Sequence, residues 1–536
     1  MKFTAGRALG LVFLLFALPA LFFAIYTDNR WEDFYITFRS SKNLVLGHGL
    51  VFTEGERLHA FTSPLGVLLP ALCSLLTGIN HDDAALWLFR LMCIAALGFA
   101  GVLIYLVLQK RGVSPLVTWT TLALAALDAK TVMFTVNGME TALVILALSL
   151  SIYALTVESR RMVVFLGVAW GGVMWVRPDG FIYAGAIALF VLIFQAGLAS
   201  ERGRVWLLRQ YAYAVGLAAA IYLPWFVWAW IYYGTPIPHT IIAKGLHQYA
   251  EEGLLDVGYY LDRADSFEDI FGPTNVRFGG WNPAIVVWSC LLWILSAAPL
   301  ILPGVARLTR ALAAAFLLVS FYLCFIAANL CSWYAPNCAW IGFLVIGLAA
   351  HDFTRDPKTS AGGGILSGLK LPRTCLGIAG VAILMQLIVV GCVFQQTYFQ
   401  QKLIEFGQRK QIGLWLKQHA VSSHDTVFVE CLGYIGYYSN LKMYDFPGLS
   451  SEEIIQSRKR QNTDIWAYLI KDLHPDWLVL RPVAIQTINI VDASILSTDY
   501  QEVQDFDCSK EIAPLSIQGR GYLEFDQYFV VYHRKH

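Results

Sequence analysis

The sequence carries little charge and no excess of either sign. Only 14% of its 536 residues are Asp, Glu, Lys or Arg, against roughly a quarter in an average soluble domain. Lys and Arg number 39 and Asp and Glu number 38, which leaves a formal net charge of +1. This composition excludes an ordinary soluble globule, and the lack of a basic excess argues against a nucleic acid as partner.

Cysteine patterns typical of metal or redox sites are also missing. The ten cysteines include no CxxC pair and no Cys/His pairing, and most of them lie in apolar segments, so a structural zinc site is not expected. Cys431 and Cys508 lie in the same C-terminal region, where a bridge between them is conceivable. The chain shows no internal repeat of about 20 to 50 residues, which argues against a repeat architecture.

Apolar residues, in contrast, are abundant. They make up 57% of the chain, aromatic residues make up 14%, and the mean hydropathy is +0.55. Such values are typical of a polytopic membrane protein. The first apolar run lacks a small-residue cleavage site, so it reads as a retained helix. Eleven runs are predicted to span the membrane: residues 8–26, 86–108, 116–134, 141–157, 162–176, 181–196, 211–233, 284–302, 311–330, 335–350 and 375–394.

The positions of Lys and Arg in the short loops predict the orientation. With eleven spans, every positive cluster falls on one side, provided that residues 63–77 form a helix in the outer interface and do not cross. We therefore expect a cytoplasmic N-terminus. No Asn is followed by the x-Ser/Thr acceptor pattern for N-glycosylation, which is consistent with a bacterial plasma-membrane protein. Residues 28–85, 234–283 and the C-terminal region then lie outside. The clusters are Lys2/Arg7, Lys110/Arg111, Arg160/Arg161, Arg202/Arg204/Arg209, Arg307/Arg310 and Arg355/Lys358/Lys370/Arg373.

Two domains are expected, a transmembrane domain over residues 1–394 and an extracytoplasmic domain over residues 395–536. The second has strand signals at 426–430, 442–446, 477–481 and 528–532, and a helical stretch over 451–472. This alternation predicts an α/β domain.

The most informative segment is the first outer loop, which reads WEDFYITFR from Trp31. Adjacent carboxylates at Glu32 and Asp33, just past the first span and among aromatic residues, suggest the lip of an active site. In a helix, Asp33 and Thr37 would share one face and Phe34 and Phe38 another, so that one surface can meet lipid and the other water. The alternative is that the acidic pair only solvates a loop.

Longer motifs resemble a known family. The run WEDFYITFRSSKNLVLGHGLVF resembles the signature of bacterial GT-C glycosyltransferases, a group that includes actinobacterial cell-wall arabinofuranosyltransferases with decaprenyl-phosphate donors. The resemblance continues along essentially the whole chain, with departures at Glu32 for the usual Asp, His239 for Asn and Gly66 for Trp. Its further motifs are GMETAL at 138–143, RPDG at 177–180, PHT at 238–240, AK at 243–244 and WYAP at 333–336.

This resemblance implies a GT-C fold and transfer of a monosaccharide, such as arabinofuranose, from a polyprenyl-phosphate donor. The acceptor would be a cell-envelope glycan, a lipid-linked saccharide or a surface protein. Such a reaction needs a base for the acceptor hydroxyl and cations for the leaving phosphate. Asp33 is the expected base, with Glu32 as helper or, together with Asp33, as ligand of a divalent cation such as Mg²⁺ or Mn²⁺. Arg177, Lys244, His239 and Arg39 are expected at the donor phosphate, and Glu140, Asp179, Trp333 and Tyr334 at the substrate.

Plainer interpretations stand beside these assignments. Asp179 could only neutralise Arg177, and Glu140 could only favour the dipole of a helix that it starts. Trp333 and Tyr334 fit an aromatic belt at the interface as well as a sugar site. Arg39 could hold Glu32. For the whole protein, the alternatives are a flippase or transporter of a lipid-linked saccharide, or a catalytically dead relative that acts as a scaffold.

Overall fold

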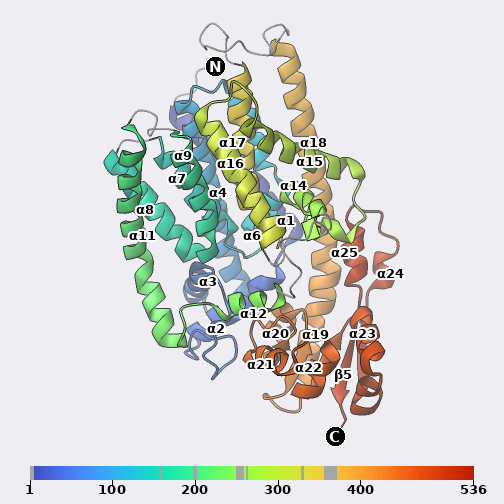
Figure 1. Cartoon of the computed structure of the whole chain (residues 1–536). Coiled ribbons are helices and arrows are strands. Elements are labelled where there is room, and N and C mark those ends of the chain that lie inside the picture. Colours follow the sequence, from blue (N-terminus) through green and yellow to red (C-terminus); the bar gives the residue numbers. More distant parts are fainter. Residues whose placement is uncertain are drawn as a thin grey trace.

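The computed structural model describes residues 5–156, 159–196, 202–248, 259–260, 263–327, 331–354 and 371–535. A long helical bundle and a smaller sheet-containing unit lie at opposite ends of the molecule (Figure 1). The N-terminus lies at the far end of the bundle, and the C-terminus lies in the sheet-containing unit.

Each of the eleven predicted spans corresponds to a helix or to a bent helix pair. Within the described ranges, seven helices are long and apolar enough to cross a membrane, and the pair α5 and α6 makes an eighth if it is one span. The other predicted spans are the shorter apolar helices α7, α8 and α9. The bundle consists of α1 (Ala5–Thr27), α4 (Asp82–Lys110), α5 (Pro115–Ala126), α6 (Ala129–Val136), α7 (Thr141–Ala154), α8 (Ser159–Val176), α9 (Phe181–Ile193), α11 (Arg204–Tyr233), α15 (Pro283–Ala297), α16 (Arg307–Phe321), α17 (Ala335–Thr354) and α18 (Leu371–Phe399).

The predicted continuous span over 116–134 is broken. Its two halves, α5 and α6, meet at an angle of 53°. The Asp128 side chain accepts a hydrogen bond from the Thr131 N–H at 2.9 Å and so caps α6 as a new helix. Periodicity alone did not show the break because both halves are apolar.

Polar contacts pair the ends of neighbouring helices as an up-and-down arrangement requires. Lys110 Nζ at the end of α4 donates to the Thr156 carbonyl beyond α7, at 3.2 Å. Arg204 at the start of α11 donates to the Ile193 carbonyl at the end of α9, at 2.9 Å.

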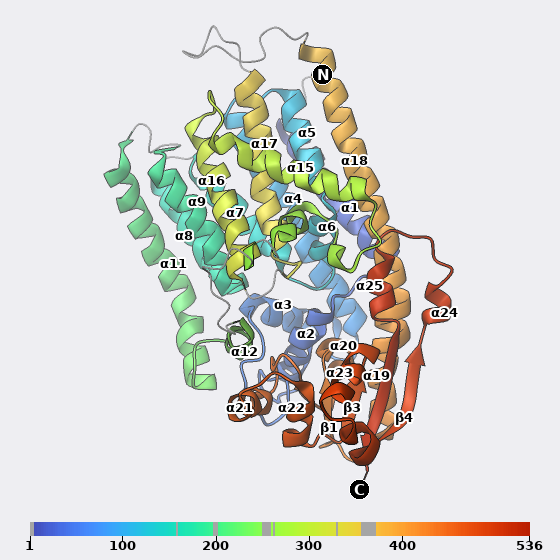
Figure 2. The same cartoon turned by 45° about the vertical axis from the view of Figure 1, so that its right-hand side comes forward.

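Three helices fill the space between the bundle and the sheet-containing unit (Figure 2). They are α2 (Glu32–Val45), α3 (Pro64–Thr77) and α12 (His239–Gln248). With 14 residues, α3 is about 21 Å long, shorter than the roughly 30 Å of a hydrocarbon core. Its Leu72, Leu75 and Leu76 are exposed, as the predicted interfacial helix requires. Short turns after α12 form η2 (Ala264–Phe267), α14 (Glu268–Phe271) and η3 (Val276–Phe278).

The C-terminal unit contains a mixed five-stranded sheet in the order β2-β1-β3-β5-β4. The strands β1, β2 and β3 are parallel, and β5 runs antiparallel to both β3 and β4. The strands are β1 (Thr426–Val429), β2 (Lys442–Asp445), β3 (Trp477–Leu480), β4 (Tyr500–Asp507) and β5 (Tyr528–Arg534). The helices are α20 (Leu432–Ser439), α21 (Glu452–Gln461), α22 (Trp466–Leu473), α23 (Pro482–Asp492), α24 (Ser509–Ile512) and α25 (Arg520–Phe525).

The α/β prediction is confirmed, with two corrections. The fifth strand, β4, was missed because only its first residue, Tyr500, is buried, so it lacks a strong apolar alternation. The predicted helix over 451–472 is two helices, because Asn462 adopts a left-handed φ of +48° and ends α21. Cys431 and Cys508 are both free thiols and form no bridge. Arg481 and Gln408, respectively, donate hydrogen bonds to them.

The expected boundary between residues 394 and 395 falls within a continuous helical rod. The helix α18 passes into the π-helix η7 (Gln400–Arg409) and then into α19 (Lys410–His419). This rod carries the chain from the bundle into the sheet-containing unit (Figure 1).

Candidate functional site

The helix α2 has one face that lines a cavity and another that packs inside the protein. Asp33 and Thr37 line one cavity, as predicted from their helical spacing. Phe34 and Phe38 do lie together on another face, with ring centroids 4.9 Å apart. Each is 1% exposed, however, so the prediction that this face meets lipid is wrong. It packs inside the protein, where the Phe34 ring lies against the backbone of Gly138.

The cavity gathers side chains from segments that are far apart in the sequence. Asp33 comes from α2, Glu140 from the start of α7, Arg177 from the end of α8, Lys244 from α12 and Trp333 from the segment before α17. Its volume is about 50 Å³, which has room for only a few water molecules. The remaining lining residues are Ile36, Thr37, Ala60, Phe61, Thr62, Ser63, Met139, Thr240 and Leu449.

Arg177 is the most heavily bonded group of the site. Its Nη1 donates to Glu140 Oε1 at 3.0 Å, and its Nε and Nη2 donate to the two carboxylate oxygens of Asp179 at 3.0 and 3.2 Å. Nη2 also donates to the Tyr334 hydroxyl at 3.0 Å. A guanidinium has five N–H groups, so these contacts leave about one N–H of Arg177 for a ligand. Asp179 and Tyr334 therefore adjoin the cavity through Arg177.

Lys244 is a cation without a hydrogen-bond partner among the described residues. Its ammonium lies 5.6 Å from the ring centroid of Trp333, and no carboxylate of the described chain pairs with it. The hydroxyls of two other cavity-lining residues, Thr62 and Thr240, lie 2.9 Å apart. Lys244 is thus the positive group best placed to meet an incoming anion.

The carboxyl group of Asp33 likewise forms no hydrogen bond or ion pair with the part of the chain that the structure describes. Burial raises the pKa of Asp33 above its usual value, and the positive charges of Lys244, Arg177 and Arg409 oppose that rise. A partly buried carboxyl that faces a cavity with its oxygens free can accept a proton from a bound hydroxyl.

Glu32 points away from the cavity. Its Oε1 accepts a hydrogen bond from the Gly433 N–H at 2.7 Å, and its Oε2 lies 3.7 Å from Arg409 Nη1. Burial raises the pKa of Glu32 to about 7, although Arg409 opposes the shift. Because Glu32 and Asp33 diverge, they do not form a two-carboxylate metal site. No group of three or more His, Cys, Asp or Glu side chains within the described ranges could hold a metal ion.

Two of the predicted phosphate ligands also lie outside the cavity. Arg39 donates to the carbonyls of Gly436 and Leu441 at 2.8 and 3.0 Å, so it neither lines the cavity nor pairs with Glu32. His239 Nδ1 lies 3.2 Å from the Glu452 carboxylate of α21. Both side chains join the first part of the chain to the C-terminal unit.

Some residues of the site had no strong signal in the sequence. Leu449 belongs to a loop of the C-terminal unit, yet it forms part of the cavity wall. Arg409 lies in an amphipathic stretch with nothing to mark it, and its charge nevertheless acts on Asp33. Only the packing of the C-terminal unit against α2 brings these residues to the site.

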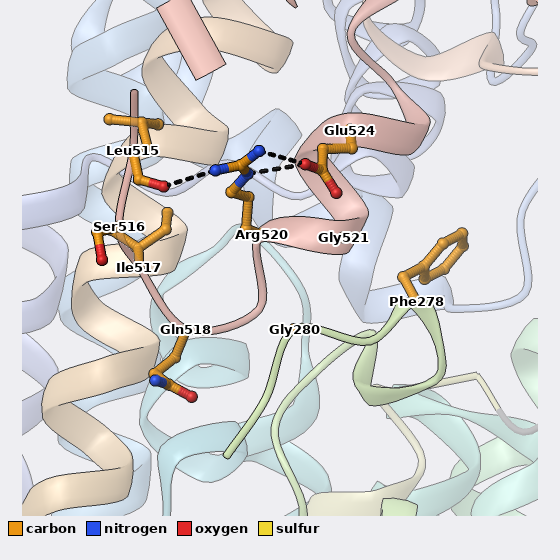
Figure 3. A pocket seen from close by; sticks show the side chains of 9 residues that line it. All are labelled: Phe278, Gly280, Leu515, Ser516, Ile517, Gln518, Arg520, Gly521 and Glu524. Atoms are coloured by element: carbon orange, nitrogen blue, oxygen red, sulfur yellow. Dashed lines mark hydrogen bonds and ion pairs between the residues drawn. The ribbon is translucent and has the colours of Figure 1, made fainter. Parts of the chain in front are cut away.

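A larger pocket lies elsewhere, between the segment around η3 and the loop before α25 (Figure 3). Its volume is about 380 Å³, and it contains none of the predicted site residues. Its main charged groups bond to each other or to the backbone: Arg520 Nε donates to Glu524 at 2.7 Å, and Arg520 Nη1 donates to the Leu515 carbonyl at 3.1 Å. The smaller cavity is therefore the better candidate for chemistry.

Comparisons with known proteins agree with this picture of the fold. A family described as a domain of unknown function, DUF8728, matches residues 396–532. The chain is 30% identical over 294 residues to a terminal β-(1→2)-arabinofuranosyltransferase of Corynebacterium glutamicum. That match spans 49% of this chain and 39% of the relative's length.

Solved structures share the fold at low sequence identity. ArnT from Cupriavidus metallidurans, bound to undecaprenyl phosphate, is 12% identical with a TM-score of 0.51, and the match covers 98% of both chains. The oligosaccharyltransferase AglB from Archaeoglobus fulgidus, in complex with an inhibitory peptide and a dolichol-phosphate, is 13% identical with a TM-score of 0.54. That match covers 87% of this chain and 68% of AglB. The chain is therefore a multi-pass membrane protein with the GT-C fold, followed by a C-terminal α/β unit.

Proposed function

We propose that the protein is an integral membrane glycosyltransferase. It moves a monosaccharide, for which arabinofuranose is the first choice, from a polyprenyl-phosphate donor to a cell-envelope glycan, a lipid-linked saccharide or a surface protein. The observation that carries the proposal is the single cavity that collects Asp33, Arg177 and Lys244 from three distant segments. The arabinofuranosyltransferase relative supports the choice of sugar, and the lipid phosphates in the ArnT and AglB structures support the choice of donor.

The chemistry divides between a base and two cations. Asp33 accepts the proton of the acceptor hydroxyl while that oxygen forms a bond to the anomeric carbon of the sugar. The bond from this carbon to the phosphate oxygen breaks, and the lipid phosphate leaves with the electron pair. Lys244 and the remaining N–H of Arg177 stabilise the charge that develops on the phosphate.

The cavity is small and open on one side. Its volume of about 50 Å³ holds only a few water molecules, so a sugar ring would extend through the opening or displace part of the wall. Two parts of the wall come from outside the bundle, namely Lys244 and Thr240 on α12 and Leu449 in the C-terminal unit. Closing them around the substrate would exclude water and strengthen the electrostatic interactions of the site.

We place the cavity at the outer face of the bacterial plasma membrane, with the N-terminus in the cytoplasm. The distribution of Lys and Arg over the loops supports this orientation. The helices α2 and α12, which contribute Asp33 and Lys244 to the cavity, lie next to the sheet-containing unit, at the end of the bundle opposite the N-terminus, in agreement with this orientation (Figure 2). In this arrangement the C-terminal unit meets the acceptor outside the cell.

The test is transfer of radiolabelled sugar from a panel of polyprenyl-phosphate donors by membranes that carry the protein. The Asp33→Asn variant should lose transfer by about 10²- to 10⁴-fold, the usual contribution of a general base. Asp83→Asn is the matched control, because Asp83 lies at the start of α4 and is exposed, with Arg30 as its partner. Wild-type membranes that transfer sugar from no donor would overturn the proposal, as would an Asp33→Asn variant with full activity. None of the proteins named in the comparisons is a flippase, and no described contact favours that alternative.

A further inference from the structure

The helix that carries Asp33 is held along its outer side by the C-terminal unit. Near its start, Glu32 accepts the Gly433 N–H of α20 at 2.7 Å. One turn later the Tyr35 ring lies 4.4 Å from that of Tyr434, also on α20. At the next turn Arg39 donates to the Gly436 carbonyl at 2.8 Å. The side of α2 away from the cavity is therefore a continuous contact with α20.

The first turn of α2 depends on these external contacts. Its N-cap residue, Trp31, makes no side-chain capping hydrogen bond, although its own N–H donates to the Asn137 carbonyl at 2.8 Å. Glu32 is the first residue of this helix, and Asp33 follows it directly. Whatever fixes the Glu32 carboxylate thus also fixes the backbone from which the Asp33 side chain extends.

Arg409 links Glu32 to a buried ionic network. Its Nη1 donates to both oxygens of Glu405 at 3.0 Å and lies 3.7 Å from Glu32 Oε2. Its Nη2 pairs with Asp526, which Arg481 Nε also contacts at 2.6 Å. The side chains of Arg409, Glu405 and Asp526 are at most 3% exposed. Because its buried partners Glu405 and Asp526 hold the Arg409 guanidinium in place, it provides a fixed positive charge beside the Glu32 carboxylate.

We propose that Glu32 and Arg409 are positioning residues, which act through the C-terminal unit to hold the first turn of α2 and keep Asp33 aimed into the cavity. This inference rests on the proposed function, in which Asp33 is the base. It assigns Glu32 a role other than that of a second catalytic carboxylate. It also makes the sheet-containing unit part of what positions the base, since Gly433 lies on its helix α20 and Arg409 pairs with its Asp526.

The test compares Glu32→Gln with Glu32→Ala in the full-length protein. The amide of Gln keeps an oxygen for the Gly433 N–H, whereas Ala removes both contacts. We expect Glu32→Ala to lower kcat by on the order of 10- to 100-fold with little change in the donor KM, because a misplacement of about 1 Å suffices for such a loss. Glu32→Gln should retain most of the wild-type kcat. Arg520→Lys is the control, since Arg520 pairs with Glu524 and Leu515 within the C-terminal unit (Figure 3).

Hydrogen–deuterium exchange separates this inference from the proposed function. The amides of residues 33–36 should exchange faster in Glu32→Ala than in wild type, Glu32→Gln or Arg520→Lys. Unchanged exchange in Glu32→Ala would overturn the positioning role, even if no donor supports transfer by the wild type. If Glu32→Gln loses as much kcat as Glu32→Ala while its exchange stays like that of wild type, Glu32 takes part in the chemistry and the inference is wrong.

Discussion

The pair formed by Arg177 and Glu140 gives a sharp test of what Arg177 does. Their side chains are 8% and 4% exposed, and Nη1 and Oε1 lie 3.0 Å apart. Replacing Arg177 by Met keeps much of its apolar volume but leaves the Glu140 carboxylate buried without its cation. Breaking a buried pair in this way typically costs about 3–5 kcal/mol. Arg177→Met should therefore be strongly destabilised.

The double variant should recover most of that loss. In Arg177→Met/Glu140→Gln no unpaired charge remains at the position of Glu140, and replacing both partners of a buried pair by neutral groups is often close to neutral. Asp179 also loses its partner, but its side chain is 24% exposed and can be solvated. We expect the double variant to cost no more than about 2 kcal/mol. The coupling energy should then lie near the upper end of the usual range of about 0.5–3 kcal/mol.

The assay combines unfolding in mixed detergent micelles with sugar transfer. If Arg177 serves the leaving phosphate, the double variant regains stability but not transfer. If Arg177 only neutralises Glu140, the double variant regains both, and the phosphate role is refuted. A double variant that is no more stable than Arg177→Met would refute the electrostatic reasoning itself.

Three further predictions concern the neighbouring groups. Lys244→Met should lower transfer on the order of tenfold or more, while Lys244→Arg retains part of it. The reason is that the Lys244 ammonium has no other hydrogen-bond partner among the described residues and is free to bind phosphate. The measurement is kcat/KM for the donor. Since Asp33 must be ionised to act as a base, transfer should fall as the pH drops through its pKa, which burial raises. Because the positive charge of Lys244 opposes that rise, its removal should move the acid limb of the kcat/KM profile to higher pH, and an unmoved limb would contradict Asp33 as the base. Gly433→Ala would place a Cβ 2.0 Å from the Glu32 carbonyl oxygen, and this clash with the backbone should lower the free energy of unfolding by about 1–3 kcal/mol. Gly172→Ala is the control: its Cβ meets open space, so the thermal unfolding temperature should stay unchanged.

Much of the bundle could be predicted from local sequence. Apolar runs of sufficient length form helices wherever the backbone must bond within one segment, so the eleven predicted spans all have helical counterparts. Local rules also placed Asp33 and Thr37 on one face of α2, since residues four apart on a helix are neighbours. The same rules identified four strands of the sheet, three of which are short, mostly buried apolar runs.

Other features depended on contacts between distant segments. Nothing local distinguishes Glu32 from Asp33, and only the Gly433 N–H on α20 draws the first carboxylate away from the cavity. Arg39 seemed suited to phosphate on the sequence pattern, yet carbonyls of the C-terminal unit take its hydrogen bonds. The β4 strand pairs at an exposed edge, where periodicity is weak.

The sequence by itself therefore determined the membrane-spanning helices, the α/β character of the C-terminal unit and the identity of the main candidate residues. These follow from hydropathy, helical spacing and motifs within short segments. The tertiary structure alone decided which charges face the cavity and which are neutralised elsewhere. A charged side chain is oriented by the partners within a few ångströms of it. Here the partners of Glu32, namely Gly433 and Arg409, come from segments hundreds of residues away.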